Sequence, residues 1–217
     1  KLYQKEQIRR YGFHGTNHKY VIERVHKLLK IKKSKIISCH LGNGSSITAA
    51  LDGKSIDTSM GFTPLEGIIM GTRSGTIDPA ITFHLQNNLK MKPKDVDHLL
   101  NHESGLLGIS EISSDMRDVY EQSQKGDEKA KLAIEMLAYQ IAKYCGAYSA
   151  AMQGLDAIIF TGGLGEKAFY VREKVLNYLE FLGFTIDKAK NASVKKSGFD
   201  FEEISFSRYA NALGAFS

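Results

Sequence analysis

The sequence predicts an α/β fold with a mixed sheet that starts as three antiparallel strands and is flanked by helices. Three observations lead to this class. Residues 35–59 contain three short strand-like segments in succession, and residues 156–160 form another buried apolar run after a long helical segment. The 217 residues, of which 42% are hydrophobic, are enough for one large domain or two small ones.

The first three strands form a predicted meander. Residues 36–39 are apolar, as in a buried strand, and residues 47–51 follow as an alternating strand. Asp52-Gly53 is a strong signal for a two-residue hairpin turn, so residues 54–59 are expected to return antiparallel.

The turn between the first two strands is rich in groups that can bind an anion. Gly42 and Gly44 allow positive φ and close approach of the backbone, and Asn43, Ser45 and Ser46 add short polar side chains. Successive backbone N–H groups in such a turn can form an anion-binding nest. Taken alone, the segment is equally well explained as an Asn-Gly hairpin turn without a ligand.

The remaining elements are predicted from periodicity, capping residues and glycines. A first helix is expected after the loop at residues 9–18, capped by Thr16 or Asn17, with its buried side at Val21, Val25, Leu28 and Leu29. Residues 60–75 are mainly loop, with Pro64 opening a short helix. Further helices are expected over 77–88, 93–102, 126–151 and 161–182, and one more after the Ser-Ser cap at 113–114. A strand is expected over 199–204.

Composition restricts the function classes. No apolar run is long enough to span a membrane, and the start shows no signal peptide. The net charge of +5 comes from scattered lysines with local clusters at residues 27–35 and 188–196, neither of them interleaved with aromatic residues, which argues against a nucleic-acid partner. Cys39 and Cys145 lie in apolar segments and are expected to be reduced core residues, which favours a cytoplasmic location.

Several residue types could carry chemistry. Arg73 lies among small residues, and its fork of donors suits a phosphoryl group or a carboxylate, although a lone arginine is usually a solvated surface residue. His14 precedes a helix, where a structural hydrogen bond is the alternative role, and His18 is interpreted as structural. The glycine-rich turn at residues 161–166 lacks Rossmann spacing but can bind phosphate through backbone N–H groups at a helix start.

Seven motifs in fixed order resemble the acetate kinase (acetokinase) family. They are RRYGFHGTNH at 9–18, HLGNGSS at 40–46, MGFTPLEG at 60–67, MGTRSG at 70–75, SGLLGIS at 104–110, SSDMRD at 113–118 and FTGGLGE at 160–166. The resemblance covers roughly residues 3–187. It implies a ribonuclease H-like fold of the actin, Hsp70 and sugar-kinase superfamily. Residues 1–34 would be an inter-domain loop and first helix, and residues 35–217 a C-terminal nucleotide-binding domain, without the family's N-terminal domain.

The resemblance also implies an activity and its residues. Acetate kinases transfer the γ-phosphoryl group of ATP to acetate, giving acetyl phosphate and ADP, with Mg²⁺ or Mn²⁺. His14 and Arg73 would be catalytic. Nucleotide- and phosphate-binding roles would fall to His40, Gly42, Asn43, Gly44, Asp115, Met116, Arg117, Gly163, Leu164, Gly165 and Arg172.

The sequence departs from the family pattern at three places. Thr76 replaces an aspartate, Lys167-Ala168 replaces Asn-Ser, and the tail has no carboxylate after Glu203, so the metal ligands are not identified. Two alternatives stay open: a propionate or butyrate kinase of the same family, and a non-catalytic nucleotide-binding remnant. The expected partners are ATP or ADP and a short-chain carboxylate, with a homodimer in the complete enzyme, and the isolated chain is expected to be inactive.

Overall fold

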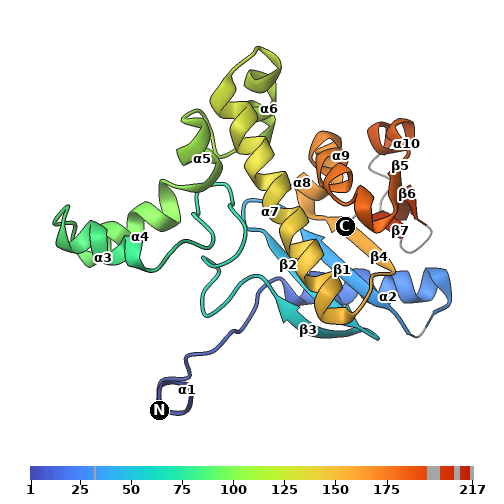
Figure 1. Cartoon of the computed structure of the whole chain (residues 1–217), viewed down its shortest axis with the longest axis horizontal. Helices are drawn as coiled ribbons and strands as arrows, with labels where there is room; N and C mark the ends of the chain where they lie inside the picture. The colour runs from blue at the N-terminus through green and yellow to red at the C-terminus, as the bar shows by residue number, and fades with distance from the viewer. Residues whose placement is uncertain (32, 195–200, 208–210, 216–217) are drawn as a thin grey trace.

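A seven-stranded mixed sheet forms the centre of the computed structural model (Figure 1), which describes residues 1–31, 33–194, 201–207 and 211–215. The strands follow the spatial order β3-β2-β1-β4-β7-β6-β5. Strand β1 pairs antiparallel with β2 and parallel with β4, so the predicted mixed sheet is confirmed. The strands are β1 (Lys35–His40), β2 (Ser46–Leu51), β3 (Lys54–Thr58), β4 (Ala157–Thr161), β5 (Phe184–Ile186), β6 (Phe201–Ser207) and β7 (Asn211–Ala215).

The predicted meander is present. Asp52 and Gly53 both have positive φ, 52° and 80°, as a type I′ hairpin turn requires. The strand expected over 199–204 is found as β6, with residues 199 and 200 outside the described residues. Strands β5 and β7 were not predicted.

Helices cover both faces of the sheet (Figure 1). They are α1 (Leu2–Lys5), α2 (Gly15–Leu29), α3 (Ala80–Asn87), α4 (Pro93–His102), α5 (Gly105–Ser110), α6 (Met116–Gln124), α7 (Glu128–Met152), α8 (Gly162–Lys167), α9 (Phe169–Tyr178), η1 (Glu180–Leu182) and α10 (Lys188–Ser193). None of the helices in the described part of the chain is long and apolar enough to cross a membrane.

Alternation along the strands explains how the two layers pack. In β1, Ile37 and Cys39 belong to the large core cluster that also contains α7, whereas Ile36 belongs to the cluster with α2. In β4, Phe160 belongs to the large cluster and Ile159 to the cluster with α2. Successive side chains of a strand point to opposite faces, so each central strand is buried on both sides.

Four details of the sequence prediction are wrong. The N-cap position of α2 is His14, which precedes the expected Thr16 or Asn17 and makes no side-chain capping bond, and Leu28 and Leu29 are exposed rather than buried. No helix follows Pro64. The single helix expected over 161–182 is interrupted at Ala168, whose ψ of 73° is not helical.

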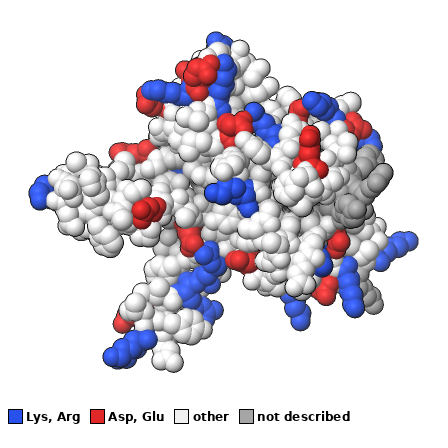
Figure 2. Space-filling view, in the orientation of Figure 1, with Lys and Arg blue, Asp and Glu red and all other residues white. Residues whose placement is uncertain are grey.

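Charged side chains are mixed on the surface. On the face shown in Figure 2, lysines and arginines are scattered among acidic and uncharged residues and do not form one basic surface. The expected cysteine state is confirmed, since Cys39 and Cys145 are both free and buried.

Candidate active site

The turn between β1 and β2 is fixed by one serine. The N–H of Gly42 donates to Ser45 Oγ (3.1 Å), and the same hydroxyl donates to the Gly42 carbonyl oxygen (3.0 Å). Within the described part of the chain, the backbone N–H groups of Asn43 and Gly44 donate to no protein acceptor. These two N–H groups can therefore take part in binding an anion, as the sequence predicts.

The loop that carries Arg73 is bonded to this turn and to the start of α5. The N–H of Gly71 donates to the Asn43 carbonyl (3.3 Å), and the N–H of Leu106 donates to the Met70 carbonyl (2.8 Å). Gly105 has a φ of +63°, and a Cβ there would lie 2.2 Å from Met70 O. A glycine is required at this close approach, which holds the Arg73 loop against α5.

His14 and Arg73 converge on Gly44. The position that a Cβ would occupy at Gly44 lies 3.1 Å from Arg73 Nη1 and 3.5 Å from His14 Nε2. His14 has left-handed backbone angles, φ 59° and ψ 25°, at the N-cap of α2. Burial, and then the nearby Arg73 charge, lowers the pKa of His14, so its imidazole is neutral near pH 7.

The ring of His40 packs against the ring of His14. The two rings are stacked, with centroids 4.1 Å apart, and His40 Nδ1 donates to Asn17 Oδ1 (3.0 Å). Burial, and then the charge of His14, lowers the pKa of His40 to about 4. Because the amide oxygen of Asn17 can only accept, this contact places the proton of the neutral ring on Nδ1, and the ring packs against His14; the phosphate-binding role of His40 stays a prediction.

A cleft of about 540 Å³ starts at the turn between β1 and β2 and extends between α6 and α8–α9. Residues predicted for nucleotide binding meet there from three distant segments: Gly42, Asn43, Asp115, Met116, Arg117, Gly163 and Leu164. A cleft of this size with a mixed polar and apolar lining suits a small-molecule ligand.

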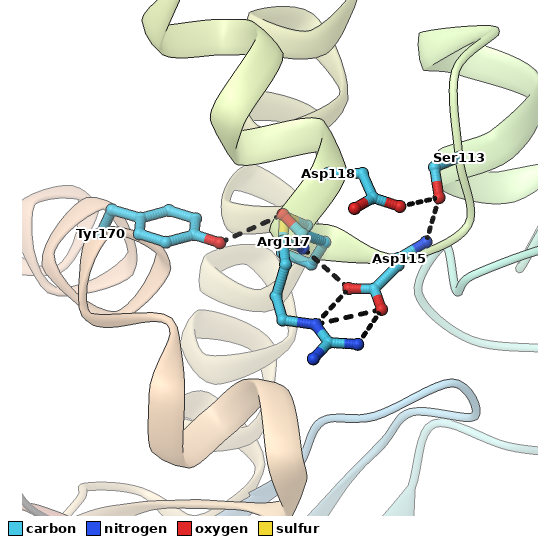
Figure 3. A network of polar contacts seen from close by, with 6 residues as sticks. Ser113, Asp115, Arg117, Asp118 and Tyr170 are labelled. Carbon is cyan, nitrogen blue, oxygen red and sulfur yellow. Dashed lines mark hydrogen bonds and ion pairs between the residues drawn. The ribbon is translucent and has the colours of Figure 1, made fainter.

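Asp115 and Arg117 form an exposed pair at the cleft (Figure 3). Asp115 caps α6 by accepting from the Arg117 N–H (2.8 Å), and it also accepts from Arg117 Nε (3.0 Å) and Nη2 (2.5 Å). The hydrogen bonds from Arg117, side chain first, lower the pKa of Asp115 to about 2. The Arg117 side chain is 84% exposed, so a ligand can reach its guanidinium.

Three aromatic side chains of the cleft were missed by the sequence analysis. The rings of Tyr120 and Tyr170 are parallel, 6° apart in plane and 3.6 Å between centroids, and Phe169 meets Tyr170 edge-on. Tyr170 Oη also donates to the Met116 carbonyl at 3.3 Å (Figure 3). Burial raises the pKa of Tyr170, so the phenol stays protonated.

The glycine-rich first turn of α8 lies against Leu41, the residue that follows β1. The N–H groups of Leu164 and Gly165 both donate to the Leu41 carbonyl, at 3.0 and 3.3 Å. A Cβ at Gly162 would lie 2.6 Å from the same oxygen, whereas a Cβ at Gly163 would meet nothing within 4 Å. Gly163 therefore lines the cleft and faces open space, whereas Gly162 and Gly165 pack against neighbouring protein atoms.

The structure corrects the prediction for Arg172. Its side chain is only 1% exposed, and Nη1 donates to the carbonyl oxygens of Gly165 (2.8 Å) and Glu166 (2.6 Å), while Nε donates to Asn191 Oδ1 (2.8 Å). Arg172 thus holds the glycine turn from behind and does not line the cleft, and Gly165 is buried with it.

The profile of the acetokinase family matches residues 1–209. The chain belongs to that family. It is 57% identical over 192 residues to the acetate kinase of Pseudothermotoga lettingae and 55% identical to that of Thermotoga maritima. These matches cover 88% and 87% of this chain but 47% and 48% of the relatives, so the chain spans about half the length of the curated relatives it matches.

Solved structures of an acetate kinase and of a propionate kinase superpose closely. The acetate kinase of Porphyromonas gingivalis has a TM-score of 0.93 at 41% identity, and the propionate kinase of Francisella tularensis has 0.90 at 45%. Each match covers 99% of this chain and 54% of the solved chain. The predicted kinase-superfamily fold is thereby confirmed.

The described part of the chain contains no cluster of side chains that would by itself hold the metal implied by the acetokinase family. Among the described residues, no group of three or more His, Cys, Asp or Glu side chains could hold an ion. The carboxylate of Asp115 is already bonded to Arg117. The tail, where the family places its metal-binding glutamate, includes residues 208–210 and 216–217, which lie outside the described residues.

Gly163→Val is expected to weaken binding of ATP and ADP together, by at least about tenfold. The fold has room for the side chain, so the valine should stand in the cleft and block the approach of a ligand to the backbone. Calorimetric titration of the chain with each nucleotide measures the effect. Gly146→Val is the matched control, because Gly146 also has nothing within 4 Å of its Cβ position but lies outside the cleft. Equal losses in both variants would argue against the assignment.

Proposed function

We propose that this chain is the nucleotide-binding part of an acetate kinase, which transfers the γ-phosphoryl group of ATP to acetate. The observation that carries the proposal is the convergence of His14 and Arg73 on Gly44, the residue after Asn43, which lines the cleft. Residues 35–217 would be the nucleotide-binding domain. Residues 1–34 would be the inter-domain loop and first helix, which fits the way the N-terminal segment leaves the sheet in Figure 1.

The cleft suggests how ATP would lie. Its base and ribose would occupy the wider part beside α6 and the tyrosine pair, and its phosphates would reach the N–H groups of Asn43 and Gly44. The γ-phosphoryl group would then lie at Gly44, next to His14 and Arg73. This orientation uses the short polar turn for charge and the aromatic end for the base.

The transfer itself needs few groups from the protein. An acetate oxygen attacks the γ-phosphorus in line, the bond to the β–γ bridging oxygen breaks, and ADP leaves with that electron pair. Catalysis of such a step consists mainly of positioning and of neutralising charge on the moving phosphoryl oxygens. The Arg73 fork can bind two of these oxygens, and the neutral His14 can donate one further hydrogen bond from Nε2.

A propionate kinase is the second candidate. The observation that favours it is the close superposition of the Francisella tularensis propionate kinase, whose identity of 45% exceeds that of the Porphyromonas gingivalis acetate kinase. Running the same assay with acetate, propionate and butyrate ranks the substrates. A homodimer in the complete enzyme and a cytoplasmic location stay predictions; the free, buried Cys39 and Cys145 fit the latter.

The 217 residues alone are expected to form no acyl phosphate above a no-protein control. They cover about half of the relatives' length, and an in-line transfer needs donor and acceptor both fixed. Joining this chain to the N-terminal half of the Thermotoga maritima relative should restore the activity; this fusion is called the fused enzyme below. The hydroxamate assay with ATP, Mg²⁺ and acetate measures both. Acetate-dependent turnover by the chain alone would contradict the expectation, and a folded but inactive fused enzyme would favour a non-catalytic remnant.

A further inference from the structure

A chain of four side chains leads from the buried sheet to the candidate active site. His14, the N-cap residue of α2, and His18, in the first turn of that helix, both contact Ser46 of β2. Ser46 Oγ lies between them, 2.9 Å from His14 Nδ1 and 2.7 Å from His18 Nε2. The other nitrogen of His18, Nδ1, lies 2.9 Å from Ser38 Oγ.

One end of this chain of hydrogen bonds is buried in the protein, and the other end lies at the candidate active site. His18 is 4% exposed, and Ser38 and Ser46 are fully buried. Its other end is His14 Nε2, which points to Gly44 and Arg73. Burial, and then the charges of His40 and His14, lowers the pKa of His18 to about 3, so both histidines of the chain are neutral near pH 7.

Proton counting gives the chain a direction. A neutral imidazole has one donor and one acceptor nitrogen, and each serine hydroxyl has one proton to donate. Among the described residues, Ser38 Oγ has no partner except His18, so only His18 Nδ1 can accept its proton. A buried hydroxyl proton left without an acceptor would be costly, about 1–3 kcal/mol. Ser38 therefore donates to His18.

The donor at each following hydrogen bond, as far as His14, is then determined as well. With Nδ1 accepting, His18 has its proton on Nε2 and donates to Ser46. Ser46 can pass its own proton to His14 Nδ1 at 2.9 Å or to the Phe13 carbonyl at 3.4 Å, and the shorter contact is the better hydrogen bond. His14 Nδ1 then accepts, which leaves the proton of His14 on Nε2.

We infer that Ser38, His18 and Ser46 are positioning residues that fix His14 in the tautomer with Nε2–H directed at the phosphoryl site. The inference rests on the proposed function, because it gives His14 a hydrogen-bond donor for a phosphoryl oxygen. Without these hydrogen bonds, either ring nitrogen of His14 could carry the proton, and part of the molecules would present a lone pair to an anion. The chain also holds the ring of a residue whose backbone is left-handed.

Histidine ¹⁵N NMR on the 217-residue chain at neutral pH tests the inference without any activity. Long-range ¹H–¹⁵N correlations show which nitrogen carries the proton, and the His14→Asn variant assigns the His14 signals. We expect Nε2–H for both His14 and His18. A proton on Nδ1 of His14 in the unmodified chain would overturn the inference.

Two variants test whether the chain of hydrogen bonds fixes the tautomer of His14. Ser46→Ala should give His14 a mixture of tautomers. Ser38→Ala does not touch His14, but it removes the fixed donor at the buried end and should shift the tautomers of His18 and His14 together. Ser59→Ala is the matched control, because Ser59 is also fully buried and bonds the backbone of β2 without touching a histidine. If the tautomer of His14 is unchanged in every one of these two variants that folds, the inference is refuted.

Kinetics separates this inference from the proposed function. In the fused enzyme, Ser46→Ala should lower kcat about tenfold with little change in KM for ATP, as is typical for residues that orient a histidine. If His14→Ala leaves kcat unchanged while NMR shows the expected tautomer, the catalytic role proposed for His14 fails and the hydrogen-bond chain stands. If His14→Ala is impaired but His14 carries its proton on Nδ1, the inference fails and the proposed function stands.

Discussion

Replacing Arg73 by leucine is expected to lower kcat of the fused enzyme by about 10³-fold, as for other arginines that contact a transferring phosphoryl group. Arg73 Nη1 points to Gly44, and among the described residues its hydrogen-bond contacts are long, to Pro64 O at 3.3 Å and Met70 Sδ at 3.6 Å. These contacts leave the guanidinium available for a ligand. The KM for ATP should change far less, because Arg73 does not line the nucleotide cleft. The hydroxamate assay at saturating ATP and acetate measures kcat.

Two other variants make the Arg73 result specific. Arg73→Lys keeps the charge but loses the planar fork, so its kcat should lie between those of the unmodified enzyme and Arg73→Leu. Arg117→Leu removes an arginine of the cleft itself, and it should weaken nucleotide binding while leaving kcat at saturation nearly unchanged. A kcat unaffected by Arg73→Leu would remove Arg73 from the catalytic assignment.

Local patterns predicted much of this fold. The hairpin at Asp52-Gly53 depends only on the backbone freedom of two adjacent residues, and the apolar stripe of α7 depends only on helical spacing. The anion-binding character of the Gly42–Gly44 turn is likewise encoded in consecutive residues. For the hairpin and the helix, a few neighbours in the sequence determine the geometry, and the structure agrees with the prediction; anion binding by the turn stays a prediction.

Features that depend on distant partners were not predictable in the same way. Tyr120 and Tyr170 lie on different helices 50 residues apart in the sequence, so no spacing rule pairs them. Arg172 was assigned to the nucleotide, yet its donors are bonded to Asn191 and to the glycine turn, which only the packing of α10 on α9 reveals. The break at Ala168 has the same origin, since its buried side chain belongs to the core.

The convergence of His14 and Arg73 is a mixed case. Each was selected from its own motif, and the family resemblance gave both a place at the transferred phosphoryl group. Their common contact point, Gly44, follows only from the fold, because α2, the β1–β2 turn and the loop held by α5 meet there. The absence of a side chain at Gly44 leaves the space that both groups face.

Replacing His14 by alanine is expected to lower kcat of the fused enzyme by about 10²-fold, less than for Arg73, as for the loss of one donor among several. His14 is neutral near pH 7, so it contributes a hydrogen bond from Nε2 and not a full charge. Its left-handed backbone complicates an alanine variant, since alanine is disfavoured there by about 1–2 kcal/mol. His14→Asn is therefore the matched variant, because asparagine tolerates this conformation and is too short to replace the ring. Both variants should lose similar activity, while thermal unfolding should show the asparagine variant to be the more stable. A His14→Asn enzyme with full kcat would mean that the backbone turn, and not the imidazole, is what the site requires.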